Sequence, residues 1–414
     1  MRAEVSAPGG SQRSAFVQLR HSPRFFAFMG AMLLGATSLG ASAVAKLEFA
    51  TQMIGNEIGI GALSIVAALG GAVMGLPAGV MVDRFGPRRI LLGVFAVMAC
   101  VHFGTAMFLS AWTPHFSVFI VLSFIEGMMV SVGAPSVAAA QAALVPKDAR
   151  GAGEIINLLR LSIGAIIGTL IAASLGRPAL TLVLCGLMAA AVAVVFWLIS
   201  RPVAFPRVED GPLSMRAFNE LFDRVRRMPL LRQTVIADLV LRFVIPTQLV
   251  NLFIVDKGAM DVAGFVILGG VIGVAVGNLS LAFTGLSGRL DRRMRFVFVG
   301  YLVNMIIGSL LMIDDYLVSH VLLLVVIVIL GSGLSTYSQG LLAAMIQQRS
   351  PDDIRGRLTG GLTGARMLLV AAGVVMATFI TSVYFTQVFT WTLAILGVIA
   401  LGVLRGFSRI GASV

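Results

Sequence analysis

The sequence predicts an all-α membrane protein in which twelve transmembrane helices form two pseudo-symmetric six-helix bundles. Three observations lead to this fold class: the composition of the 414-residue chain, the length of its apolar runs, and features that recur at offsets of 205–208 residues. Composition indicates a lipid-facing exterior, the runs give the number of spans, and the recurrence indicates a duplication.

Composition excludes a soluble globular protein. Hydrophobic residues make up 58% of the chain and charged residues only 12%, with a mean hydropathy of +0.97. A soluble domain carries about 25% charged residues because its whole surface faces water. Most of this exterior must therefore face lipid, where a spanning backbone has to satisfy its own hydrogen bonds. Apolar and polar residues do not alternate along these runs, as they would in the strands of a β-barrel, and this favours helices.

Twelve apolar runs are long enough to cross a bilayer as helices of about 20 residues. Several are rich in glycine, and small residues let neighbouring helices approach closely in lipid. The predicted spans are 25–46, 59–82, 90–111, 116–140, 154–176, 178–200, 231–255, 263–286, 296–313, 318–343, 360–382 and 387–406.

The basic residues predict the orientation. If the N-terminus is cytoplasmic, 25 of the 31 Lys and Arg residues fall on the cytoplasmic side. The opposite side receives only Lys46, Arg177 and Lys257. The remaining three lie within spans: Arg160, Arg242 and Arg366. Because one missed span would invert every later loop, this asymmetry predicts an even number of spans with both termini cytoplasmic.

The net charge of +12 comes from short basic clusters between apolar runs, so no nucleic-acid partner is expected. Cys100 and Cys185 lie within apolar runs and are expected to be small core residues. The four histidines are scattered without ligand spacing, so neither a metal site nor a cofactor is predicted. Residues 1–24 are polar and basic, and no cleavable signal is expected.

A polar interruption separates the sixth and seventh spans. Within it Phe218, Leu221, Phe222 and Val225 recur at helical spacing, which predicts an amphipathic helix on the cytoplasmic membrane surface. A partner-binding role is the alternative to a plain linker. The predicted division is a cytoplasmic tail 1–24, a bundle 25–200, a linker 201–230, a second bundle 231–407 and a cytoplasmic tail 408–414.

The two halves share three features at nearly one offset. The Asp-Arg pair that follows the second span at Asp83 follows the eighth at Asp291, 208 residues later. A Pro-x-x-x-Arg-Gly loop follows both the fourth and the tenth spans, at an offset of 205. Arg160 and Arg366, early in the fifth and eleventh spans, are 206 residues apart. Such a repeat predicts six plus six helices, a common plan for alternating-access carriers.

The loop at residues 79–89 carries the most specific local pattern. Gly79 permits tight helix packing, and Gly86 permits the left-handed turn that ends the helix. Asp83 can meet a neighbouring helix N-terminus. The loop resembles the signature loop of the major facilitator superfamily, with Pro87 in place of a usually basic residue and matches at Gly79, Asp83, Arg84, Gly86, Arg88 and Arg89.

The resemblance covers nearly the whole chain through the span count, the linker and the repeated loops. It implies that Asp83, Arg84 and Arg88 form a cytoplasmic conformational latch rather than a substrate site. The second-half copy, with Asp291 and Arg292, is degenerate because its glycine lies three rather than four residues before the aspartate. Within the superfamily the chain is similar to bacterial exporters of drugs or siderophores, although its fourth span lacks their arginine and its fifth span lacks their Gly-Pro pair.

Charged residues within spans are costly, which makes each a candidate functional group. Glu126 falls near the middle of span four, and Asp238 and Arg242 are spaced to pair along one face of span seven. Pro246 is expected to break that helix and to free carbonyls for a substrate or ion. The resemblance implies that spans one, four, seven and ten line a central cavity. The candidate substrate or coupling residues are therefore Thr37, Ser38, Glu126, Asp238, Arg242, Gln248, Asn251, Tyr337 and Gln339.

Each candidate has a structural alternative. Asp238 and Arg242 also fit a purely structural ion pair, and Glu126 fits a protonated helix–helix contact. His102 is expected to be an interior polar group rather than a proton relay. Four arginines near span ends are expected to brace the gate or to snorkel rather than touch substrate: Arg150, Arg160, Arg355 and Arg366.

The sequence thus predicts a secondary active transporter in a bacterial inner membrane, working as a monomer among membrane lipids. We expect it to move a small solute by alternating access, coupled to a proton or ion, with export favoured and Glu126 and the Asp238–Arg242 pair as coupling groups. The alternative is a carrier of a metal cation such as iron, since Asp238, Gln248 and Asn251 offer oxygen ligands. A receptor or an intramembrane enzyme is disfavoured because the sequence has no His-Glu-x-x-His pair, Gly-x-Ser-x-Gly turn or output domain.

Overall fold

The computed structural model describes residue 19 and residues 22–54, 57–110, 116–146, 149–201, 215–243, 260–284, 321–351 and 355–383. Regular structure in these segments is α-helical throughout. The helices are α2 (Pro23–Ile54), α3 (Glu57–Phe85), α4 (Pro87–Leu109), α5 (Phe116–Leu144), α6 (Arg150–Leu175), α7 (Pro178–Ser200), α8 (Met215–Arg227), α9 (Pro229–Phe243), α11 (Met260–Thr284), α14 (Val321–Arg349) and α15 (Arg355–Val383).

Ten of the twelve predicted spans coincide with these helices. α2 to α7 match the first six, α9 matches the start of the seventh, and α11, α14 and α15 match the eighth, tenth and eleventh. The ninth and twelfth predicted spans lie outside the described residues. Six of the described helices are long and apolar enough to cross a membrane, and α3 is a seventh if its two bent segments count as one span. The prediction of an all-α membrane fold is confirmed.

Glycine and proline mark where two pairs of consecutive helices meet. Gly86 separates α3 from α4 with φ 79° and ψ 147°, a conformation that essentially only glycine adopts, and Pro87 opens α4. Gly176 ends α6 in the left-handed region at φ 54°, and Pro178 opens α7. The left-handed turn predicted at Gly86 is not formed: its φ is positive, but its ψ of 147° lies outside the left-handed helical region that Gly176 adopts.

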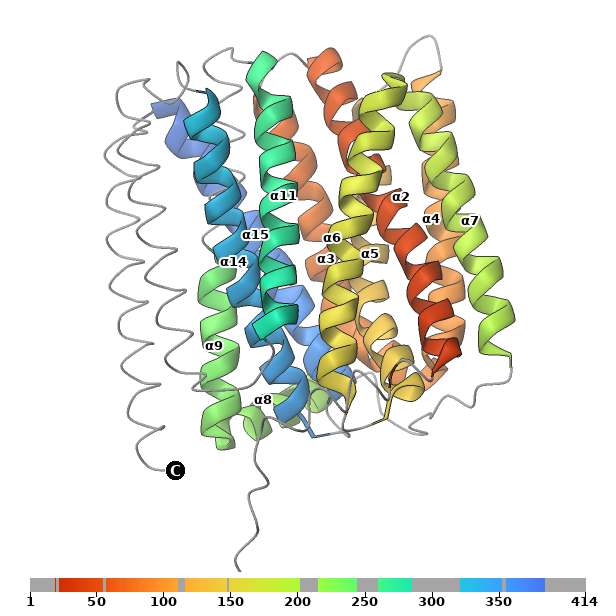
Figure 1. Cartoon of the computed structure of the whole chain (residues 1–414), viewed down its shortest axis with the longest axis vertical. Helices are drawn as coiled ribbons and strands as arrows, with labels where there is room; N and C mark the ends of the chain where they lie inside the picture. The colour runs from red at the N-terminus through yellow and green to blue at the C-terminus, as the bar shows by residue number, and fades with distance from the viewer. Residues whose placement is uncertain are drawn as a thin grey trace, which may run out of the picture.

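The upright helices stand side by side in two groups (Figure 1). The first group, α2 to α7, is joined by contacts of α2 with α6 and α7, of α3 with α5, and of α4 with α7. The second group comprises α9, α11, α14 and α15, and its largest contact is between α11 and α14. The groups meet mainly where α3 packs along α15 and where α6 packs along α11.

One end of the bundle serves as a reference for depth. We call it the linker end: α8 lies across it, α3, α5 and α14 finish there, and α4, α6 and α15 begin there, at the bottom of Figure 1. Since a helix rises about 1.5 Å per residue, sequence distance from this end gives the depth of a residue in the bundle.

Glycines set how closely α3 and α15 approach. Each helix carries a glycine at every fourth position along this contact: Gly71, Gly75 and Gly79 on α3, and Gly356, Gly360 and Gly364 on α15. Backbone meets backbone there, because a Cβ added to Gly79 would lie 2.6 Å from the carbonyl oxygen of Gly356. Small residues at such spacing are a standard means of joining helices in lipid, where no hydrophobic effect drives association. We call these six residues the α3–α15 glycine contact.

The amphipathic helix α8 is present, but its apolar side faces protein. Leu221 and Val225 are buried against Ile346 of α14 and Leu358 of α15, whereas Phe222 is exposed. The prediction that this face rests on the membrane surface is therefore wrong for Leu221 and Val225. The ends of α14 and α15 present apolar side chains at the linker end, and α8 covers them.

Candidate functional site

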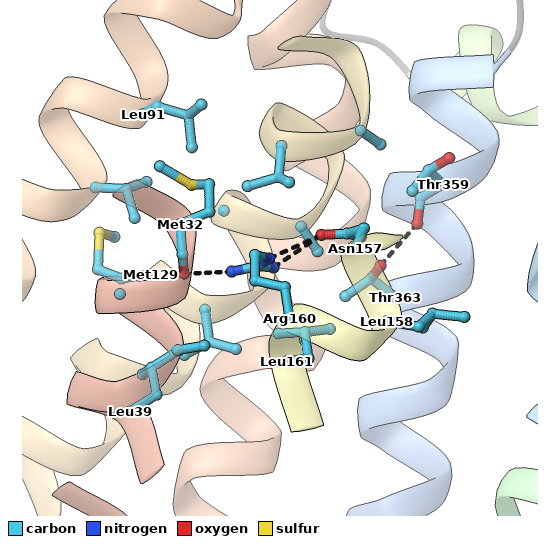
Figure 2. A pocket seen from close by; sticks show the side chains of 18 of the residues that line it. Met32, Leu39, Leu91, Met129, Asn157, Leu158, Arg160, Leu161, Thr359 and Thr363 are labelled. Carbon is cyan, nitrogen blue, oxygen red and sulfur yellow. Dashed lines mark hydrogen bonds between the residues drawn. The ribbon is translucent and has the colours of Figure 1, made fainter. Parts of the chain in front are cut away.

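An internal cavity of about 340 Å³ lies between the two groups of helices (Figure 2). One wall comes mainly from α2, α4, α5 and α6, and the other from α14 and α15. Its lining residues on α4, α6 and α15 begin at the fifth residue of each helix, so it lies in the half of the bundle nearer the linker end. Most of the lining is apolar, and its polar members are Ser38, Glu154, Asn157, Arg160, Thr359, Thr363 and Arg366. An apolar cavity with a few convergent polar groups is the usual form of a small-molecule site.

Arg160 reaches from α6 along the cavity wall toward Met32 of α2 (Figure 2). Its Nε and Nη2 donate hydrogen bonds to Oδ1 of Asn157 at 3.1 and 2.9 Å. Its Nη1 donates to the carbonyl oxygen of Met32. Because Asn157 and Arg160 are three residues apart on one helix face, the amide fixes the guanidinium in place. Both acceptors are neutral, so the positive charge remains at the wall.

Glu154 is the one acidic residue among those lining the cavity. It lies three residues before Asn157 and thus on the same face of α6. The side chains of Asn157 and Gln141 hydrogen-bond to it, and its carboxylate interacts electrostatically with Arg160 and Arg366. Glu154 therefore connects the guanidinium groups of both halves of the molecule.

Arg366 enters the cavity wall from α15 and is held by Asp238 of α9. Its Nε donates to Oδ2 of Asp238 at 2.6 Å. The Asp238 side chain is completely buried, whereas Arg366 is 19% exposed. The predicted partner of Asp238 was Arg242, one turn along the same helix. The structure pairs this carboxylate with Arg366 of the neighbouring helix. The side chain of Arg242 lies outside the described residues, so its pairing with Asp238 stays a prediction.

Arg160 and Arg366 were expected to brace the gate or to snorkel rather than touch substrate. They do tie helices together, as braces would, but both also line the cavity. α6 begins at Arg150 and α15 at Arg355, so the two arginines lie ten and eleven residues into their helices. At about 1.5 Å per residue this is about 15 Å, too deep for the guanidinium to reach the helix end by snorkelling.

The two arginines occupy equivalent positions in the internal repeat. Arg160 contacts position 32 on the first helix of its half, and Arg366 contacts position 238 on the first helix of the other half. Both the arginines and their contacts are offset by 206 residues. The two halves differ in the group that accepts the hydrogen bond from the arginine. It is the backbone carbonyl of Met32 for Arg160 and the carboxylate of Asp238 for Arg366. The duplication therefore extends from the sequence to the cavity wall, with one half carrying an additional charge.

A second charged cluster lies within the first group, farther from the linker end. Glu126 of α5 forms an ion pair with Lys46 of α2 and accepts a hydrogen bond from Ser42 Oγ at 3.1 Å. Nε2 of the buried His102 lies 3.7 Å from the same carboxylate. Glu126 is not among the residues that line the cavity. The placement of Lys46 in an external loop was wrong, because α2 continues to Ile54 and carries Lys46 inside the helix.

Removing one partner of the Lys46–Glu126 pair should cost more stability than removing both. Glu126→Gln leaves the buried ammonium of Lys46 without its carboxylate, and we expect a loss of about 3 kcal/mol. The double variant Lys46→Met/Glu126→Gln should recover most of this, because it buries no charge. Thermal unfolding of the two variants in detergent measures the difference. A single variant as stable as the unmodified protein would contradict the pairing.

Asp83 lies at the N-terminal turn of α15 and so connects the two groups at the linker end. A Cβ built on Gly356 would lie 2.5 Å from Oδ1 of Asp83, so only glycine allows the carboxylate to come this close. Nε of Arg357 lies 3.9 Å from Oδ2. A carboxylate is favourable at a helix N-terminus, where the backbone dipole is positive. Asp83 thus meets a neighbouring helix N-terminus, as the sequence predicts.

The arginines of the same loop lie at the surface. The guanidinium of Arg84 is 5.6 Å from the ring centre of Phe85. Arg84 and Arg89 are exposed, and Arg88 is half-buried. The second-half copy of the motif, Asp291 and Arg292, lies outside the described residues.

A protein-family model described as Major Facilitator Superfamily matches residues 24–374, most of the chain. The chain belongs to this superfamily. Membership makes it a transporter rather than an enzyme, and an integral membrane protein that crosses the bilayer several times. It confirms the resemblance drawn from the loop at residues 79–89, at the level of the superfamily.

Solved structures of superfamily transporters share the fold. The human organic anion transporter MFSD10 (TETRAN) superposes with a TM-score of 0.71 at 16% identity, covering 92% of this chain and 99% of that one. The Escherichia coli fucose:proton symporter FucP gives 0.62 at 13% identity, with 93% and 98% covered. A bacterial homologue of the iron transporter ferroportin, in the outward-facing state with soaked iron, gives 0.64 at 16% identity, with 93% and 99% covered. No curated protein matches the chain in sequence.

The other predicted cavity residues of this superfamily member are spread over several environments. Ser38 lines the cavity and donates to the carbonyl oxygen of Cys185 at 3.0 Å. Thr37 donates to the carbonyl oxygen of Leu33 at 3.0 Å and is buried where α2 meets α6. Tyr337 Oη lies 2.8 Å from Thr284 Oγ1, and Gln339 Nε2 donates to Ser335 at 3.0 Å.

Thr37, Tyr337 and Gln339 are not among the residues that line this cavity. Gln248 and Asn251 lie outside the described residues, as does the side chain of Arg355. Arg150 is the first residue of α6 at the linker end. Of the nine predicted substrate or coupling residues, the structure thus brings Ser38 to the cavity directly and Asp238 through Arg366.

Glu154 and Asn157 are the residues that the sequence interpretation missed. Glu154 was the first residue of a predicted span and was therefore treated as a boundary rather than as an intramembrane charge. The spacing of these residues could have indicated the site, because Glu154, Asn157 and Arg160 follow one another at intervals of three and therefore share one helix face. An acidic, an amide and a basic side chain on one face of an apolar helix indicate a polar site.

Proposed function

We propose that this protein is a secondary active carrier that moves a small organic solute by alternating access through the cavity between its two halves. The observation that carries the proposal is the cavity itself, because residues of both halves line it. Each half contributes one arginine, Arg160 or Arg366, at equivalent positions of the repeat. A solute held between two halves can be exposed to either side when one half rocks against the other.

The contact between α3 and α15 supports a role as the gate at the linker end. Asp83 meets the N-terminus of α15, and the α3–α15 glycine contact extends from there toward the middle of the bundle. Both must separate before the cavity can open toward the linker end. In this proposal they form the latch that the sequence motif predicts.

A reversible disulfide across the latch tests alternating access without knowledge of the solute. The variant Asp83→Cys/Gly356→Cys places two thiols where the carboxylate now meets α15, in a background with Cys100 and Cys185 replaced by Ala. A third cysteine, Ser38→Cys, reports on the cavity. We expect oxidation to slow its labelling by an impermeant thiol reagent from the linker side by at least about 10-fold, because the gate can no longer open. Reduction should restore the rate.

The control is Arg89→Cys in the same background, which is exposed outside the cavity and should be labelled at the same rate in both states. Equal labelling of Ser38→Cys in the locked and unlocked protein would contradict the proposed gate.

The orientation of the carrier follows from its basic residues. With Lys46 inside α2, the count made on the sequence leaves only Arg177 and Lys257 in the loops opposite the predicted cytoplasmic side, against 25 basic residues on that side. The positive-inside rule then favours cytoplasmic termini, with the tail 1–24, bundles 25–200 and 231–407, linker 201–230 and tail 408–414 in the order that the sequence predicts. We propose a bacterial inner membrane as the location.

Coupling, direction and oligomeric state stay predictions. Glu126 was the predicted coupling group, and its burial with Lys46 and His102 is compatible with ion-linked movement of α2 against α5. Export as the direction of transport, and a monomeric state, likewise stay predictions made from the sequence. The superfamily structures above are named for an organic anion, for fucose with a proton and for iron, so the fold accommodates each of these cargoes.

The metal-cation alternative receives less support from the cavity. Oδ2 of Asp238, the proposed ligand, accepts a hydrogen bond from Arg366, and a guanidinium beside a metal site would repel the cation. Among the described residues, no group of three or more His, Cys, Asp or Glu side chains is placed to hold a metal ion.

A further inference from the structure

We propose that the cavity binds an organic anion with an apolar body, and that one proton enters with it and resides on Glu154. This inference rests on the proposed function, because it takes the cavity as the solute site. It names the substrate class and the residue that links the solute to the proton.

Arg366 offers the anion the two terminal amino groups of its guanidinium. Within the described part of the chain, its one hydrogen bond is from Nε to Asp238, which leaves both terminal amino groups available on the cavity wall. Two parallel N–H groups match the two oxygens of a carboxylate or phosphonate and bind them in a bidentate manner. Asp238 fixes the orientation of this edge by holding Nε from behind.

Arg160 supplies a second guanidinium, and the hydrogen bonds that it donates go to neutral acceptors. Asn157 and the carbonyl oxygen of Met32 are neutral, and they accept three of its five N–H donors. The remaining two donors lie on a side chain that lines the same cavity. The anion therefore meets one guanidinium from each half of the protein, and its binding would link the two halves.

The charges around the cavity require a proton to accompany the anion. Arg160 and Arg366 are balanced by Glu154 on the wall and Asp238 behind it, and no other Asp, Glu, Lys, Arg or His is found among the residues lining this cavity. An added anion would leave an uncompensated negative charge in a region of low dielectric, which is strongly unfavourable. Protonation of one carboxylate removes that charge.

Glu154 is the carboxylate placed to take the proton. It borders the cavity and interacts with both arginines, so an incoming anion competes with it for the same guanidinium groups. Asp238 is completely buried and is held by the short bond to Arg366. When the proton moves onto Glu154, the arginines are released to the solute, and the neutral acid keeps its contacts with Asn157 and Gln141.

The rest of the wall selects an apolar body. Met32, Leu39, Phe95, Met98 and Met129 line the side of the cavity formed by the first half. A volume of about 340 Å³ is at the lower end of small-molecule pockets and suits a ligand with one or two rings.

Three probes of one shape and different charge test the substrate class: 2-naphthoate, 2-naphthamide and 2-naphthamidine. Binding is measured by calorimetry on the full chain in lipid nanodiscs. We expect 2-naphthoate to bind at least about 10-fold more tightly than the neutral amide and the cation, and more tightly at pH 5.5 than at pH 7.5. Calorimetry in two buffers of different ionisation enthalpy should show uptake of one proton per anion. Equal binding of the three probes, or tighter binding of the cation, would overturn the proposal without any variant.

Two variants assign the groups. Arg366→Lys keeps the charge but removes the bidentate edge and should weaken 2-naphthoate at least about 10-fold. Glu154→Gln should bind 2-naphthoate with no proton uptake and no pH dependence, since it imitates the protonated acid. The matched control is Asp223→Asn, which removes an exposed carboxylate of α8 that does not line the cavity and should leave the proton uptake intact. Proton uptake that persists in Glu154→Gln, or that disappears in the control, would overturn the role of Glu154.

The labelling of Ser38→Cys separates this proposal from the one on which it rests. If labelling depends on the latch but 2-naphthoate does not bind selectively, the carrier function stands and the substrate class is wrong. If labelling does not depend on the latch, the proposed function fails first.

Discussion

Replacing Gly75 by valine should prevent the linker end from closing. Gly75 lies at the centre of the α3–α15 glycine contact, and even a single added Cβ would overlap the Cα of Gly364. The neighbouring atoms are backbone, so the clash cannot be relieved by a rotamer change, and the helices must separate. Overpacking of this kind costs about 3 kcal/mol, which corresponds to a change of about 100-fold in the ratio of closed to open gate.

Spin labels at Arg89→Cys and Phe222→Cys, with Cys100 and Cys185 replaced, measure this separation. Both positions are exposed at the linker end; Arg89 belongs to α4 of the first group, and Phe222 to α8, which packs on α14 and α15 of the second. The distance distribution should move to longer values in Gly75→Val and move partly in Gly75→Ala. Gly93→Val is the matched control, because a Cβ at Gly93 meets no atom within 4 Å. An unchanged distribution in Gly75→Val would show that the contact does not hold the gate shut.

The fold was predictable because each span is encoded locally. No knowledge of packing is needed to recognise the length of the apolar runs, the junction at Gly86 and Pro87, or the unequal distribution of basic residues between the two sides of the membrane. The predicted ends were less certain where polar residues continue a helix. α2 extends past its predicted end at residue 46, because Lys46 finds a carboxylate inside the bundle and need not face water.

The site was predictable only where a residue acts within its own helix. The spacing of Asp83 and the glycines before it is local, and these residues do lie at the contact with α15. The partner of Asp238 is not local, since it depends on α15 packing beside α9, which the sequence alone does not reveal. Local spacing therefore favoured Arg242. The amphipathic pattern of α8 likewise indicates an apolar face but does not tell whether protein or lipid covers it.

The partner of Asp238 gives the second large expected effect. Arg366→Gln should destabilise the protein by about 3–5 kcal/mol, because it takes from a completely buried carboxylate the guanidinium that binds it at 2.6 Å. Arg242→Gln should cost much less, since a pair at i, i+4 on one helix contributes only about 0.2–0.5 kcal/mol. Denaturation of both variants in the same detergent distinguishes the interhelical pair from the one that the sequence favours. A larger loss in Arg242→Gln would reverse the assignment.

The same pair should respond asymmetrically to the removal of its two members. Asp238→Asn leaves the charge on Arg366, whose side chain is 19% exposed and lines the cavity, so water or a ligand can solvate it. Arg366→Gln leaves the charge on Asp238, which no water reaches. We therefore expect Asp238→Asn to be the milder single variant and the double variant Asp238→Asn/Arg366→Gln to be more stable than Arg366→Gln alone. A double-mutant cycle measures this coupling. The asymmetry follows from the depth of the two groups: Asp238 is completely buried, whereas Arg366 is partly exposed and lines the cavity.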